Sequence, residues 1–134
     1  MSLSVVKSSR DLFLTCATVL FLTPLSGLSI DIFTPALPQM QSVFGVSSAK
    51  VSSMLVFYLV GFGLSQIFWG WLSDSVGRKR VLNIGLYSAL ASSWVLCFSD
   101  HWWWLLCARF FQGASLGAVN TICRAIFIDL FSIF

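Results

Sequence analysis

The sequence Gly70-Trp71-Leu72-Ser73-Asp74-Ser75-Val76-Gly77-Arg78-Lys79-Arg80 lies between two long apolar runs. It is short and polar, it contains two glycines, and it ends in three consecutive cations. Clustered charges and irregular backbone are excluded from the hydrocarbon of a bilayer unless protein or water surrounds them. We therefore expect a compact loop outside the membrane, on the cytoplasmic side that lysine and arginine favour.

The composition indicates an integral membrane protein. The 134 residues are 57% hydrophobic and only 10% charged, whereas soluble domains carry about 25% charged residues. The net charge of +3 does not indicate nucleic acid as a partner, because the cations gather at the ends of apolar runs. The lipid bilayer is the expected partner.

Four apolar runs are long enough to cross a bilayer as helices, which takes roughly 20 residues each. They cover residues of about 12–30, 51–72, 81–98 and 102–122. Strict alternation of apolar and polar residues is absent, so barrel strands do not fit. The prediction is an all-α integral membrane bundle of four transmembrane helices, forming a single domain over residues 1–134.

The cations set the predicted orientation. Lys50 stands alone on one side of the membrane, and six cations share the other side: Lys7, Arg10, Arg78, Lys79, Arg80 and Arg124. The positive-inside rule then places both termini in the cytoplasm. Pro24 predicts a kink in the first helix. Pro35 and Pro38 predict its end, followed by a stiff extended segment.

Arg109 is the most unusual residue of the fourth run. It lies seven residues into the run, or about 10 Å along a helix, where a charge facing lipid costs at least about 2.5 kcal/mol at the bilayer centre. It should face a bundle interior or a watery cavity, together with Gln112 one turn later; the alternative is that it snorkels to the outer headgroups. Gly113 and Gly117 form a small-x-x-x-small pair that favours close helix packing.

Two aspartates are candidate functional residues. Asp31 ends the first predicted span, where it suits a proton-coupled carrier or a counter-charge for a cationic substrate; a simple interfacial residue is the alternative. Asp74 follows the second predicted helix, whose C-terminal dipole disfavours a carboxylate. It should pair with Arg78 or Lys79 or with another helix N-terminus, unless it is simply solvated.

The sequence contains no pattern typical of an enzyme or a metal site. The four cysteines are scattered through apolar runs and form no C-x-x-C pair with one another or cluster with the lone His101. No nucleophile with a base, no phosphate loop and no ligand set is present. Neither a cofactor nor a metal is expected.

The motifs resemble those of the major facilitator superfamily. The segment from Gly70 to Arg80 resembles its signature loop between helices two and three, and Arg109-Phe110-Phe111-Gln112-Gly113 resembles the fourth-helix R-x-x-Q-G motif of proton-coupled drug exporters. Asp31-x-x-x-Pro35-x-x-Pro38 is similar to the end of helix one in drug/proton antiporters, especially the Bcr/CflA group. Ala125, Ile126 and Asp129 also resemble that group.

The resemblance implies efflux of drugs or other small amphiphilic substrates from bacterial cells across the inner membrane, coupled to H⁺. Arg109 and Asp31 would serve proton coupling or the response to substrate. A conformational latch at the cytoplasmic helix ends would involve Gly70, Asp74, Gly77, Arg78 and Lys79, and helix packing would involve Gln112, Gly113 and Gly117. Ser75 departs from the family, which often has a basic residue at this position.

Length is the larger departure from the family pattern. The family fold has twelve helices in two halves, and this chain resembles the first four, an incomplete N-terminal domain. Its apolar ending, Leu130 to Phe134, suggests an interrupted reading frame. Two alternatives to an exporter therefore stay open. One is a non-transporting remnant or a subunit that needs a complementary chain; the other is a small self-assembling four-helix multidrug pump, although such pumps carry a first-helix glutamate and this chain has none.

Overall fold

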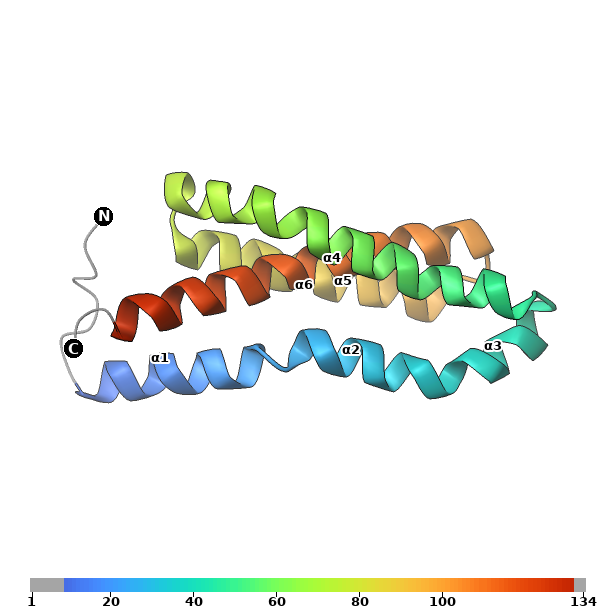
Figure 1. Ribbon diagram of the computed structural model, residues 1–134, viewed down its shortest axis with the longest axis horizontal. Coiled ribbons are helices and arrows are strands. Elements are labelled where there is room, and N and C mark those ends of the chain that lie inside the picture. Colours follow the sequence, from blue (N-terminus) through green and yellow to red (C-terminus); the bar gives the residue numbers. More distant parts are fainter. Residues whose placement is uncertain (1–8, 132–134) are drawn as a thin grey trace.

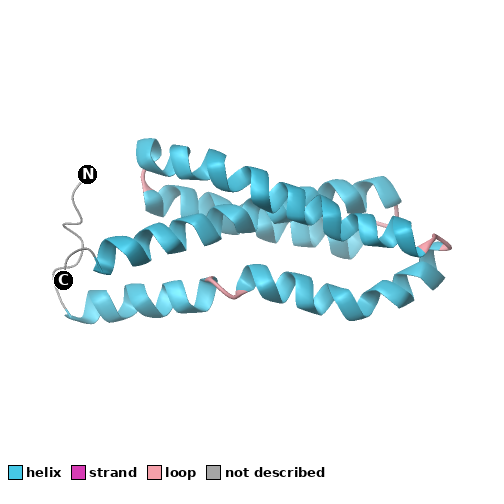
Figure 2. Ribbon diagram, viewed as in Figure 1, coloured by secondary structure: helices cyan, strands magenta, loops and turns pink. Residues whose placement is uncertain are grey.

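The computed structural model describes residues 9–131, and all of its regular elements are helical (Figure 2). Lys7 and residues 132–134 lie outside this range. Part of the predicted orientation rests on Lys7, and part of the prediction drawn from the apolar ending rests on residues 132–134. The helices are α1 (Ser9–Leu22), α2 (Leu25–Phe33), a 3-10 turn (Thr34–Ala36), α3 (Leu37–Phe44), α4 (Ser48–Val76), α5 (Arg78–Phe98) and α6 (Trp102–Phe131). The predicted all-α membrane bundle is confirmed.

The first predicted span is longer than its sequence suggested. Elements α1 to α3 follow one another as a rod along one side of the bundle (Figure 1), and the apolar helical stretch runs from Phe13 to Phe44. The break that Pro24 predicts is present between α1 and α2. The predicted extended segment after Pro35 is wrong, because Pro35 and Pro38 each occupy the first turn of a new helical element, where a missing N–H costs nothing.

The predicted loop from Gly70 to Arg80 is also wrong in its secondary structure. Residues up to Val76 continue α4, Arg78 begins α5, and Gly77 alone separates the two helices. Gly77 has φ of +102°, a conformation that residues with a Cβ rarely adopt. The cations therefore belong to the first turn of α5, and Asp74 lies within the last turn of α4.

Glycines bring α4 and α6 into backbone contact. A Cβ at Gly61 would collide with the Phe110 carbonyl, and one at Gly113 would collide with the Tyr58 carbonyl. Gly117 faces Ser65 in the same way. Small residues permit such close approach between membrane helices, where packing rather than burial drives association. The structure thus places Gly113 and Gly117 at the tightest crossing of the bundle.

Helix α6 is the central element, packed most extensively against α4 and α5 and also against α1 and α2 (Figure 1). Three helical stretches among the described residues are long and apolar enough to cross a membrane: Phe13–Phe44, Ser48–Val76 and Arg78–Phe98. Helix α6 is 30 residues long and carries the polar residues Arg109, Gln112 and Asn120. Its Gln112 and Asn120 are buried at 9% and 7% exposure, so surrounding protein, rather than lipid, meets these polar groups.

We predict that Gly113→Ala destabilises the bundle by about 1–3 kcal/mol, as overpacking does. The new methyl group would have to push α4 away from α6. Gly63→Ala on α4 is the matched control, because no atom lies within 4 Å of its added Cβ, and it should stay within about 0.5 kcal/mol. Thermal unfolding in detergent, followed by circular dichroism, measures both. Equal effects of the two substitutions would contradict the packing assignment.

Candidate functional site

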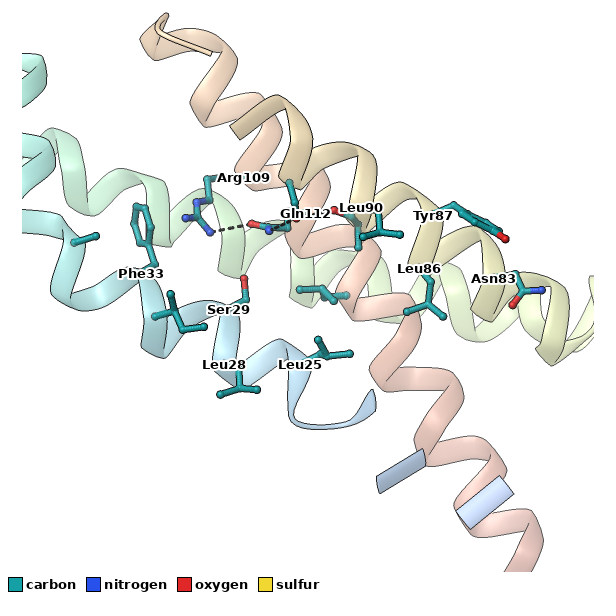
Figure 3. Close-up of a pocket in the computed structure, with 15 residues that line it drawn as sticks. Leu25, Leu28, Ser29, Phe33, Asn83, Leu86, Tyr87, Leu90, Arg109 and Gln112 are labelled. Atoms are coloured by element: carbon teal, nitrogen blue, oxygen red, sulfur yellow. Dashed lines mark hydrogen bonds between the residues drawn. The ribbon is translucent and has the colours of Figure 1, made fainter. Parts of the chain in front are cut away.

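A hydrogen-bonded chain of side chains fixes the position of Arg109. Its Nη1 donates to Gln112 Oε1 at 2.8 Å, and Gln112 Nε2 donates to Ser93 Oγ on α5 at 3.0 Å (Figure 3). The Ser93 hydroxyl donates in turn to the Ala89 carbonyl at 2.9 Å. Because the hydroxyl proton of Ser93 is used in this bond, the Ser93 oxygen can only accept in its hydrogen bond with Gln112. This determines which end of the Gln112 amide faces Arg109.

Phe33 of α2 covers one face of the guanidinium. The Arg109 Cζ lies 3.7 Å from the centre of the Phe33 ring, within the range of a cation–π contact. The Arg109 Nε is buried and has no hydrogen-bond acceptor among the described residues. The side chain is thus held against the bundle by Phe33 of α2 and by Gln112.

A cavity of about 800 Å³ opens beside this network, between α2, α5 and α6 (Figure 3). Its polar groups include Arg109, Gln112, Ser29 and Ser93. Most of the remaining wall is apolar, with leucines from α2, α5 and α6: Leu25, Leu28, Leu86, Leu90 and Leu116. The volume falls within the range of about 300–1,000 Å³ that is typical of small-molecule sites.

Asp31 does not line this cavity. It lies on α2, within the apolar helical stretch Phe13–Phe44, which continues past residue 30 where the first span is predicted to end. Its side chain is exposed, and the cavity is lined instead by Leu28, Ser29, Ile32 and Phe33 of the same helix. The structure therefore does not bring Asp31 and Arg109 together.

Arg78 pairs with Asp129 rather than with Asp74. Its Nη1 donates to the Asp129 carboxylate and, at 2.8 Å, to the Ala125 carbonyl. No ion pair or hydrogen bond of the described side chains involves Asp74, which is exposed on the last turn of α4 together with Lys79 nearby on α5. Of the alternatives predicted for Asp74, a pair with Arg78 is thus not present among the described residues, and Asp74 is exposed as the solvated alternative requires.

Ser93 and Phe33 are residues of the site that were not predicted from the sequence. Each is an ordinary residue of an apolar run, and each gains its importance from the way its helix is rotated against α6. Within residues 9–131, no group of three or more His, Cys, Asp or Glu side chains could hold a metal ion. The arrangement offers a half-buried cation, neutral hydrogen-bonding groups and an apolar wall, which suits binding of a small molecule.

Residues 19–133 match the Major Facilitator Superfamily. The chain is 32% identical over 108 residues to an uncharacterized MFS-type transporter, YdgK, of Bacillus subtilis, covering 81% of this chain and 27% of that protein. It is 29% identical over 126 residues to multidrug resistance protein D of Escherichia coli, covering 94% and 32%. It is 36% identical over 110 residues to a chloramphenicol resistance protein of Pseudomonas aeruginosa, covering 78% and 26%.

The chain thus spans about a quarter to a third of the length of these curated relatives. No solved structure matches it. A match that extends over most of the chain does not favour the alternative of a small self-assembling four-helix pump.

The pairing of Arg78 with Asp129 can be measured by a double-mutant cycle with Arg78→Met and Asp129→Asn. We expect a coupling energy of about 0.5–1 kcal/mol in thermal unfolding. The value is modest because the two side chains are 31% and 29% exposed. The control cycle joins Arg78→Met with Asp74→Asn and should show no coupling. Stronger coupling of Arg78 to Asp74 than to Asp129 would contradict the structure.

Proposed function

Because this chain belongs to the major facilitator superfamily, we propose that it forms the N-terminal part of a proton-coupled exporter of drugs or other small amphiphilic compounds. The single observation that carries the proposal is Arg109, a half-buried cation with a buried Nε, between apolar helices at the wall of a cavity of about 800 Å³. A buried intramembrane charge is expensive and is retained for function by default. The names of two relatives, which refer to multidrug and chloramphenicol resistance, support the substrate class.

Arg109 and Asp31 have separate roles in the proposed transport. Arg109 lines the cavity, where it responds to substrate. Asp31 lies inside a membrane-crossing stretch and is exposed outside the cavity, so its ionised form needs water or a protein partner. This carboxylate, which lies apart from the substrate cavity, is the proposed basis of coupling to H⁺.

The corner between α4 and α5 is the proposed latch. Gly77 permits the sharp reversal, and the pair of Arg78 with Asp129 ties the corner to α6. Gly70 lies beside Thr121 of α6, so the end of α4 can slide against α6 without a bulky side chain in the way. Asp74 and Lys79 are exposed at this corner and offer opposite charges to a complementary part of the transporter.

The proposed location is the bacterial inner membrane, with both ends of the chain in the cytoplasm. The start of α1, the α4–α5 corner and the end of α6 lie at the same end of the bundle (Figure 1). Arg10 and the cations Arg78, Lys79 and Arg80 are at this end, whereas Lys50 lies near the start of α4 at the other. The positive-inside rule supports this orientation.

Transport is tested in bacteria that lack their own major efflux pumps and express the gene encoding this sequence. Chloramphenicol accumulation should fall relative to cells without the gene, and a protonophore should restore it. Arg109→Ala should return accumulation to the level of the empty vector, because the buried cation is lost. Arg124→Ala removes an exposed arginine from the same helix and should leave export intact. Unchanged accumulation of chloramphenicol and of other amphiphilic drugs would refute the proposed function.

Orientation is tested separately with reporter fusions. Green fluorescent protein fused after Phe134 should fluoresce, because it folds in the cytoplasm, and alkaline phosphatase at the same place should be inactive. Alkaline phosphatase inserted between Ser99 and His101, in the α5–α6 turn, should be active. The reverse pattern of reporter activity would overturn the orientation.

A further inference from the structure

The cavity between α2, α5 and α6 combines one cation with a long apolar wall, which is the pattern expected for a ligand with one charged end. We propose that this cavity binds an amphiphilic anion, with its carboxylate-like head on Arg109 and its apolar body along the leucines of α2 and α5. As an assignment of substrate class, the inference rests on the proposed function. The binding itself can be measured without transport.

The first argument is the uncompensated charge of Arg109. Asp129 is paired with Arg78, and Asp31 is exposed and does not line the cavity. Among the described residues, Arg109 therefore has a neutral amide and an aromatic ring as neighbours but no carboxylate. A half-buried guanidinium attracts an anion more strongly than one surrounded by water does, because the effective dielectric constant around it is lower.

The second argument is the shape of the polar end. Gln112 accepts from Arg109 and donates to Ser93, so this amide is already satisfied by its neighbours. Phe33 covers one face of the guanidinium, which leaves its edge as the part that can reach a ligand in the cavity. Arginine presents a planar fork of N–H groups that matches the two oxygens of a carboxylate. A cationic head would be repelled at this position.

The third argument is the apolar wall. On α5 the lining extends from Ser93 down to Asn83, a distance of about 15 Å along a helix. Leu86 and Leu90 lie on this stretch, opposite Leu25 and Leu28 of α2 (Figure 3). Leu28 and Leu90 are 49% and 59% exposed, so the cavity is open at its side. A single-chain amphiphile dissolved in the bilayer can enter laterally.

The test uses dodecanoate with a photoreactive diazirine in its tail and the purified chain in phosphatidylcholine nanodiscs. Irradiation followed by peptide mass spectrometry should place the adducts on the cavity-lining segments of α2 and α5. Unlabelled dodecanoate should compete for labelling. Dodecanamide and dodecyltrimethylammonium, which keep the tail but change the head, should need concentrations at least about tenfold higher, as expected when a charge-assisted pair is lost.

Variants separate the charge of Arg109 from its packing. Arg109→Gln should reduce labelling about tenfold or more, and Arg109→Lys should retain part of it because the charge stays but the fork is lost. Arg124→Gln is the matched control, since it removes an exposed cation from the same helix, and labelling should not change. Circular dichroism shows whether each variant is folded. If Arg109→Gln unfolds, the comparison of the carboxylate, amide and trimethylammonium heads on the unmodified chain still tests the inference.

A second arm distinguishes the source of the anion. Nanodiscs that contain phosphatidylglycerol should lower the labelling by dodecanoate if an anionic lipid is the natural occupant, and should leave it unchanged if a free amphiphile is. Equal labelling by all three heads, or labelling that is independent of Arg109, would overturn the inference. If dodecanoate binds in an Arg109-dependent way but the chain exports no drug, the proposed function is refuted and this inference stands. If the chain exports drugs but labelling does not depend on the head group, this inference is refuted and the proposed function stands.

Discussion

Backbone contact between α4 and α6 is the constraint on which the rest of the structure depends. Inside a bilayer the surrounding lipid is as apolar as the side chains, so helices associate through close packing and hydrogen bonds. Gly61 and Gly113 remove the side chains that would hold the two backbones apart, and Trp69 of α4 donates its indole N–H to the Ala114 carbonyl of α6 at 3.0 Å. This crossing leaves α6 little freedom to rotate.

The fixed rotation of α6 determines where its polar residues point. Gly113 and Gly117 face α4, and Arg109, Gln112 and Leu116 lie about a quarter of a turn away at 3.6 residues per turn, which directs them to the cavity beside α2 and α5. On α5, Gly85 faces Ala118 and Ser115, so that Ser93, about two turns further along, can reach Gln112. Small residues therefore place the site although they are not part of it.

The sequence predicted the elements whose signals are local. Apolar length gave the membrane helices, and the spacing of Gly113 and Gly117 indicated a close crossing. The signals that misled were local as well: the polar stretch from Gly70 to Arg80 looked like a loop, although the positive φ of Gly77 alone reverses the chain. Pro35 and Pro38 looked like helix stops because proline breaks helix interiors, yet each occupies a first turn. The partnership of Ser93 and Phe33 with Arg109 depends on the register between helices, which one sequence does not contain.

Helix α2 keeps the carboxylate of Asp31 apart from the guanidinium of Arg109. Phe33 points to Arg109, whereas Asp31, two residues earlier, lies about 200° around a helix with 3.6 residues per turn and is exposed. A direct ion pair between Asp31 and Arg109 would require α2 to rotate by about half a turn, which would also withdraw Phe33 from the guanidinium and break the bond from the Tyr58 hydroxyl to the Ser26 carbonyl at 2.9 Å. In the arrangement described, neither charge neutralises the other. Arg109 and Asp31 therefore each need a counter-charge or water of their own.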